Sequence, residues 1–235
     1  MTMNFRDLPD MSAAYAEIQE KAKKKLDAVG KEDGDVDNDG DVDLYVTNFG
    51  QDVFYRNNGN GTFTDVSSEV GIDNGLWGAS AAFFDMENDG LLDLYVSNYV
   101  EYSIDNNPWC GIRYEKGGRT DLRDYCKPDF FIGVEDQLLH NLGSWKFNNV
   151  SDVSGISGNK GKGLGVIPAD FDQDGDLDLY IGGRSVPGKY PITPKSVLLE
   201  NDGSGKFNDI TLKTSNSLSK SGLVTSSIWT DINGD

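Results

Sequence analysis

The sequence is poor in histidine, cysteine and positive charge. It has one histidine, two cysteines, and 21 lysines and arginines against 39 acidic residues, for a net charge of −18. This charge argues against nucleic acid and anionic membranes as partners, because both repel an acidic protein. With a single histidine and no nucleophile or phosphate-binding glycine loop in a recognised setting, an enzyme is not expected.

Long apolar runs are also missing. No window approaches the ~18 apolar residues that a membrane span needs, and the N-terminus lacks the apolar segment of a secretory signal. Residues 1–32 instead predict a charged helix, from about Pro9 to Val29, because apolar residues there recur every three or four positions. Its composition is unrelated to that of residues 33–235.

The remainder is rich in glycine, with 28 in the chain, and aromatic residues make up 11%, too many for a disordered acidic segment. Helical periodicity is scarce after residue 30, which predicts an all-β class with many tight turns. Three segments repeat one acidic pattern: "DVDNDGDVDLYVTN" from Asp35, "DMENDGLLDLYVSN" from Asp85 and "DFDQDGDLDLYIGG" from Asp170. "DINGD" from Asp231 begins a fourth.

Each repeat predicts four short antiparallel strands. The β-rich runs "GASAAFF", "GLGVIPA" and "GLVTSSIWT" precede the last three acidic loops, and an Asn-Gly hairpin follows each of the first three. Four strands in about 50 to 60 residues are the content of one β-propeller blade. We therefore expect a partial propeller of about three and a half blades, with an insertion at residues 100–133. Tandem hairpins of a β-sandwich are the alternative.

A propeller needs at least about four blades to close. The first unit has no strand before Asp35, and the fourth loop is incomplete, with only Asp231, Asn233 and Asp235 at its ligand positions. These features predict a fragment or a fused reading frame.

The acidic loops follow the pattern D-x-[DE]-x-D-G-x-x-D. Side-chain oxygens at positions 1, 3 and 5 face inward, and the glycine at position 6 permits a sharp turn. Position 7 is Asp41, Leu91 or Asp176, and the leucine indicates that this position offers its backbone carbonyl. A set made only of oxygen ligands favours calcium ahead of magnesium, and zinc is not expected because the loops lack histidine and cysteine.

Two other interpretations of the loops are an EF-hand and an acidic turn that is merely solvated. An EF-hand needs a glutamate at position 12 and flanking helices, whereas position 12 here is Val46, Val96 or Ile181, each in an expected strand. The EF-hand is therefore excluded. Acidic turns that are merely solvated remain an alternative.

These features resemble the FG-GAP or VCBS repeat family, and within it the ASPIC/UnbV branch of cartilage acidic proteins. The resemblance rests on "FYRNNGNGTFTDVS", "GASAAFFDMENDGLLDLYVSNYV", "GKGLGVIPADFDQDGDLDLYI" and "WCGIRYEKGGRTDLRDYCKPDFFIGVEDQLL", and covers about residues 33–235. It implies a calcium-binding, secreted or cell-surface β-propeller that holds about three Ca²⁺ ions. The ligands carried over by position are Asp35, Asp37, Asp39 and Asp43; Asp85, Glu87, Asp89 and Asp93; and Asp170, Asp172, Asp174 and Asp178.

The resemblance also bears on the insertion. In an exported family Cys110 and Cys126 are expected to form a disulfide, with two free thiols in a cytosolic fragment as the alternative. Trp109, Arg113 and Tyr114 are expected to contact an extracellular protein or glycan, together with Tyr102 and Arg119. The predicted function is a non-catalytic adhesion or interaction module, and the alternative is an architectural segment of a larger exported protein or enzyme.

The histidine and the tryptophans could in principle have other functions. His140 occupies the place of Arg56 and Glu200 in the sibling units, which predicts an exposed strand end without a catalytic role. Trp77, Trp109, Trp145 and Trp229 are expected to fill gaps between packed sheets, and a ligand-stacking surface is the alternative.

Overall fold

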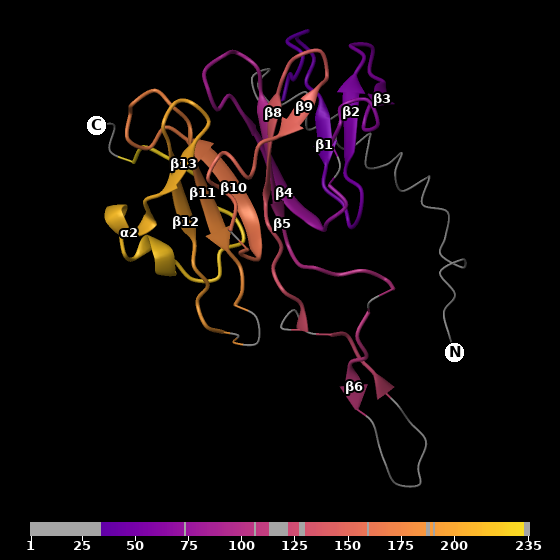
Figure 1. The fold of residues 1–235 in the computed structure, drawn as a ribbon, viewed down its shortest axis with the longest axis vertical. Helices are drawn as coiled ribbons and strands as arrows, with labels where there is room; N and C mark the ends of the chain where they lie inside the picture. Colours follow the sequence, from indigo (N-terminus) through magenta and orange to yellow (C-terminus); the bar gives the residue numbers. More distant parts are fainter. Residues whose placement is uncertain are drawn as a thin grey trace.

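The structure, a computed structural model, describes residues 34–232 apart from 73, 106, 113–121, 127–129, 159, 187–188 and 190. The expected N-terminal helix lies outside these residues. The described chain is all-β, as predicted, with three antiparallel sheets side by side (Figure 1). Its helical elements are short, α2 at Thr211–Thr214 and the 3-10 turn η3 at Leu218–Lys220.

Each sheet is a meander in which consecutive strands pair, apart from the excursion between β5 and β8. The first sheet has three described strands and the other two have four, which is consistent with propeller blades. In order, the strands are β1 (Leu44–Val46), β2 (Val53–Asn57) and β3 (Phe63–Asp65); β4 (Gly78–Phe84), β5 (Asp93–Asn98), β8 (Gln137–Asn141) and β9 (Phe147–Asn149); β10 (Gly163–Ala169), β11 (Asp178–Gly183), β12 (Val197–Asn201) and β13 (Phe207–Asp209).

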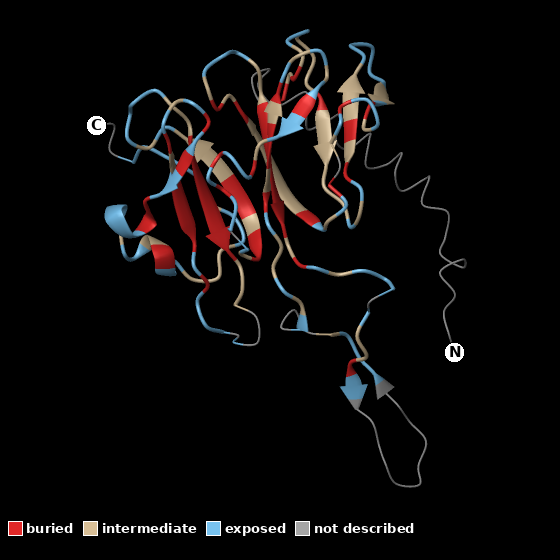
Figure 2. Cartoon of the chain, viewed as in Figure 1, coloured by how far each residue is buried: buried red, intermediate tan, exposed pale blue. Residues whose placement is uncertain are grey.

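The sheets stack face to face because their central strands are apolar on both sides. Every residue of β5 is buried (Figure 2). Leu94 and Val96 pack toward the first sheet in a cluster with Phe54, while Tyr95 points the opposite way and packs with Leu179 of the third sheet. Since side chains alternate along a strand, β5 serves two cores at once.

The predicted strand in "GLVTSSIWT", residues 222–230, is not formed. Val224 N–H donates to Gly183 O at 2.9 Å, so the segment touches the end of β11, but no ladder follows. The equivalent strands β4 and β10 pair with the strand that follows their own acidic loop. Among the described residues, 222–230 have no pairing partner of that kind.

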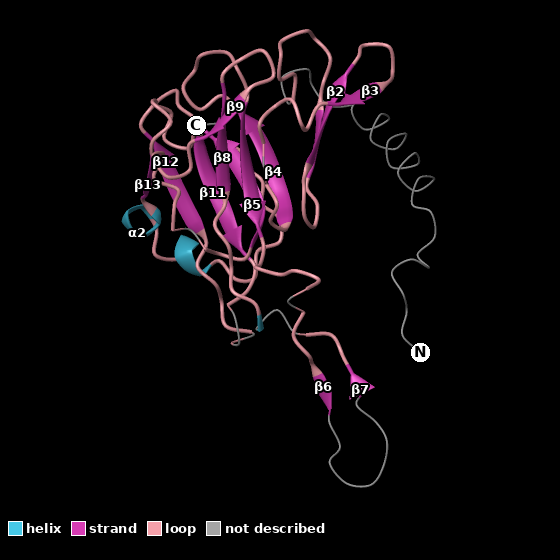
Figure 3. Cartoon of the chain, turned by 45° about the vertical axis from the view of Figure 1, so that its right-hand side comes forward, coloured by secondary structure: helices cyan, strands magenta, loops and turns pink. Residues whose placement is uncertain are grey.

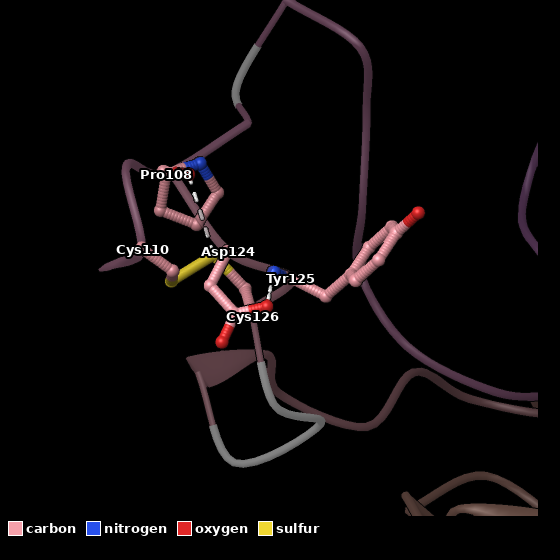
Figure 4. The surroundings of a disulfide bond; sticks show 5 residues. All are labelled: Pro108, Cys110, Asp124, Tyr125 and Cys126. Atoms are coloured by element: carbon pink, nitrogen blue, oxygen red, sulfur yellow. Dashed lines mark hydrogen bonds between the residues drawn. A yellow bond between two sulfur atoms is a disulfide. The ribbon is translucent and has the colours of Figure 1, made fainter. Parts of the chain in front are cut away.

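The segment between β5 and β8 projects away from the sheets, at the end opposite the acidic loops (Figures 1 and 3). It carries the two-stranded ribbon of β6 (Gly111–Ile112) and β7 (Leu122–Arg123). The predicted Cys110–Cys126 disulfide is confirmed, with the two Cα atoms 5.2 Å apart (Figure 4). Within the described ranges, no helix has the length and apolarity needed to cross a membrane.

Candidate metal sites

The three acidic loops adopt one conformation, organised by the aspartate at position 1. One oxygen of this carboxylate accepts from the backbone N–H of position 5 at 3.0–3.1 Å, and the other from the glycine N–H of position 6 at 2.8–3.1 Å. The position-5 carboxylate accepts from the N–H of position 7 at 2.8–3.0 Å. The loops therefore curl around their own carboxylates.

Two left-handed residues in each loop make this curl possible. The glycines at position 6 have φ of 86° to 99°, which explains the requirement for glycine there. Position 4 is also left-handed, with φ of 57° to 64°, although a side chain is present: Asn38, Asn88 and Gln173. Asparagine tolerates this region better than most residues.

The aspartate at position 9 anchors each loop to its sheet. Asp43, Asp93 and Asp178 are 1–3% exposed. One oxygen of each accepts from the backbone N–H of position 2. The other accepts from the backbone N–H of the first asparagine of the following hairpin turn, at 2.7–2.8 Å. Burial raises the pKa of Asp43 and Asp93 to about 7 and that of Asp178 to about 6, although the backbone donors oppose the shift. A cation nearby would favour the ionised carboxylates.

Position 7 points its side chain away from the loop interior. A Cβ placed on Gly59, in the first hairpin turn, would lie 2.5 Å from Asp41 Oδ2, and one on Gly143 would lie 3.7 Å from Leu91 Cδ1. Asp176 lies against Gly203 in the same way. These orientations agree with the expectation that position 7 offers only its carbonyl.

Each loop brings a set of possible metal ligands together. Atoms within 4.8 Å of one another come from Asp35, Asp37 and Asp39 in the first loop; from Glu87 and Asp89 with His140 in the second; and from Asp170, Asp172 and Asp178 in the third. Asp41, Asp43, Asp85, Asp93, Asp174 and Asp176 are not in these sets. Asp231 is exposed, and Asn233 and Asp235 lie outside the described residues.

The first loop passes a direct test of fit to a cation. Asp37 Oδ2 accepts from Trp145 Nε1 at 2.7 Å, whereas Asp37 Oδ1 is buried with no hydrogen-bond partner in the described structure. A buried acceptor without a donor is costly unless something positive meets it. Oxygen ligands that converge on one point suit Ca²⁺, which takes six to eight oxygens.

His140 is a residue whose position the sequence pattern misjudged. It is half-buried rather than at an exposed strand end, and its Nε2 lies 2.6 Å from Glu87 Oε1. Arg56, at the same place in the first hairpin, lies over the Trp145 ring at 5.9 Å instead. The second loop therefore differs from the others in having a nitrogen ligand within reach.

Hydrogen bonds connect each loop to the next unit. An amide at position 4 reaches the carbonyl of the glycine at position 6 in the following loop. The first asparagine of a hairpin turn reaches back to the position-2 carbonyl of the preceding loop. The bonds are Asn38 Nδ2 to Gly90 O (2.9 Å), Asn88 Nδ2 to Gly175 O (3.2 Å), Asn141 Nδ2 to Val36 O (3.1 Å) and Asn201 Nδ2 to Met86 O (2.7 Å). The loops thus form one continuous array along the stacked sheets.

The tryptophans differ in burial, and the expected packing between sheets is seen for Trp145. Trp145 packs on the core between the first two sheets, with its ring 5.3 Å from that of Phe54. Trp77 and Trp229 are 37% and 39% exposed. Trp109 is half-buried, and the other expected contact residues Arg113, Tyr114 and Arg119 lie outside the described residues.

Comparison with known families agrees with the repeat analysis. The family described as FG-GAP-like repeat matches residues 35–96, from the first aspartate of the first loop into β5. A comparison with curated proteins found no match. The expected FG-GAP resemblance is confirmed for residues 35–96, and acidic loops of this kind are typical of FG-GAP calcium sites.

Proposed function

We propose that this protein is a calcium-stabilised, non-catalytic binding module of the ASPIC/UnbV branch, acting outside the cell. The proposal rests on one observation: the acidic loop occurs three times with the same hydrogen bonds and with positive φ at the same two positions. Acidic turns that were merely solvated would not be constrained to one shared backbone conformation.

Calcium would contribute stability directly. Each loop confines several carboxylates, and their mutual repulsion falls when a cation is present. A ligand that binds only the folded state stabilises it by about 2.7 kcal/mol at a hundredfold excess over its Kd. Because the loops are bonded to one another, ions there would also hold neighbouring sheets in register.

The extracellular location is supported by the disulfide and by the FG-GAP-like repeat. The projecting insertion is the surface offered to a partner, since the acidic loops occupy the opposite end of the sheets. Deleting residues 100–133 should abolish capture of an extracellular protein or glycan while leaving calcium binding intact. Unchanged capture would overturn the contact role.

Calcium binding is tested by titration calorimetry and thermal melting on chelator-treated protein. We expect about three ions per chain and a higher Tm with Ca²⁺ than with chelator. Asp39→Asn keeps the acceptor for the Asp41 N–H and should remove or weaken one site. Glu69→Gln changes charge equally at an exposed position outside the loops and serves as the control. An unchanged melt with chelator, or equal effects of both variants, would refute the proposal.

A second candidate is an architectural segment of a larger exported protein or enzyme. Ile228, Trp229 and Ile232 are 84%, 39% and 91% exposed and follow the third sheet, where another blade would pack. This role predicts that the chain binds calcium but captures no partner through the insertion. The deletion described above separates the two candidates.

A further inference from the structure

A cavity of about 580 Å³ lies where the insertion leaves the sheets, far from the acidic loops. Its wall combines side chains from the sheet end, including Trp77, with residues of both arms of the insertion, including Tyr102 and Arg123. Clefts of 300–1,000 Å³ that combine apolar rings with a few polar groups are typical of small-molecule sites.

The apolar part of the wall is a set of aromatic rings. Tyr102 connects Trp77, at 6.0 Å between ring centroids, with Phe131, at 5.3 Å and nearly perpendicular. Trp77 is 37% exposed, and Tyr125, which also lines the cavity, is 94% exposed. Such rings offer flat apolar faces to a ligand, and the tyrosines add hydroxyls at their edges.

The polar part of the wall contains both donors and acceptors. With the Asn107 amide turned so that its oxygen faces the donors, it accepts from Tyr102 Oη at 3.2 Å and from Arg123 Nη2 at 2.9 Å. Asp124 stands beside Arg123 in the wall. The opposite charges of Arg123 and Asp124 offset each other in the wall, and the acidic chain repels an anionic ligand. The cavity therefore favours a neutral ligand with hydroxyls that both donate and accept.

Covalent and backbone bonds hold the wall in place before any ligand arrives. The disulfide joins Cys110 to Cys126, and Asp124 N–H donates to Cys110 O at 2.8 Å, so the two arms of the insertion are tied together (Figure 4). On the sheet side, Tyr99 N–H donates to Trp77 O at 2.9 Å. A wall that is already ordered loses little conformational entropy on binding.

We propose that this cavity binds a neutral carbohydrate, with C–H faces of the sugar against Trp77 and Tyr125, and sugar hydroxyls bonded to Arg123 and Asp124. The proposal deepens the proposed function, on which it rests, by naming a glycan rather than a protein as the partner of the insertion. The calcium loops take no part in it.

The test is a glycan array of neutral, sialylated and sulfated oligosaccharides probed with the full chain in calcium, followed by calorimetry with the best neutral ligand. We expect binding to neutral glycans, weakened about tenfold or more by Arg123→Ala and by Tyr125→Ala. Trp229→Ala removes a 39% exposed ring that lies against Tyr180 of the third sheet, away from the cavity wall, and should bind as the parent does. Tyr125 is so exposed that its removal should not disturb folding.

Three outcomes would overturn the proposal: no neutral glycan bound, only acidic glycans bound, or neutral binding unaffected by both cavity variants. The calcium-dependent rise in Tm is measured on the same samples. If that rise persists while glycan binding is absent, the cavity assignment fails and the calcium module stands. If the rise is absent, the proposed function itself fails.

Discussion

The asparagine that begins each hairpin turn offers a quantitative test of how neighbouring units are joined. Asn201 is 2% exposed, and its amide donates to Leu177 O within its own unit at 3.2 Å and to Met86 O of the preceding unit at 2.7 Å. Its Oδ1 accepts from Gly203 N–H at 3.2 Å. Asn201→Ala removes all three bonds and leaves the buried Met86 carbonyl without this donor.

Asn57 in the first sheet supplies the matched control. It makes the two bonds within its unit, to Val42 O at 3.0 Å and from Gly59 N–H at 3.2 Å, but no bond to another unit among the described residues. The difference between Asn201→Ala and Asn57→Ala therefore isolates the bond between units together with the greater burial of Asn201. A buried carbonyl left unsatisfied costs about 1–3 kcal/mol.

We expect Asn201→Ala to lower Tm by roughly 2–12 °C more than Asn57→Ala, since 1 kcal/mol shifts Tm by about 2–4 °C in a domain of this size. Asn141→Ala, which loses a bond to Val36 O at 3.1 Å, should behave like Asn201→Ala. The assay is thermal and denaturant unfolding with excess calcium present. Equal losses in all three variants would refute the account of inter-unit bonding.

Three further predictions follow from single features. Burial raises the pKa of Asp136 to about 7, so between pH ~4 and ~7 the folded state holds a proton that the unfolded state has released. The free energy of unfolding therefore falls as pH rises through that window. Asp136→Asn should flatten this fall in melts measured against pH, and an unaltered slope would contradict the assignment. The Cys110→Ser/Cys126→Ser variant should lose up to about 3 kcal/mol of unfolding free energy in the loop-entropy model. A protease should then cut this variant faster within residues 100–133, and cleavage at the parent rate would argue against a stabilising disulfide. Asp41→Asn should change the calcium affinity of the first loop by no more than about threefold from that of the parent, because the Asp41 side chain lies against Gly59. A loss of affinity as large as that of Asp39→Asn in the same titrations would disprove the carbonyl role of position 7.

Local sequence rules predicted the features that depend on neighbouring residues. The apolar runs at Gly78–Phe84 and Gly163–Ala169 are the strands β4 and β10, and the glycines at loop position 6 all have positive φ. The disulfide of the insertion was expected from the family resemblance, and the structure confirms the pair. These features are set within a short stretch of chain or by one motif.

Features that depend on packing between distant segments were missed. The approach of His140 to Glu87 depends on the register of β8 against β5, and a strand pattern does not specify which loop residue a side chain reaches. The strand expected at residues 222–230 needed a pairing partner, and propensity alone did not form it. The cavity at Trp77 and Arg123 requires the path of the insertion, which the sequence does not specify.

Calcium binding by the acidic loops is tested by a structure of crystals grown with Ca²⁺, in which the ions are identified by their anomalous signal. One calcium is expected in each complete acidic loop, bound by side-chain oxygens of positions 1, 3, 5 and 9 and by the carbonyl oxygen of position 7. Loops that contain only water, with Asp37 and Asp172 turned into solvent, would contradict this expectation.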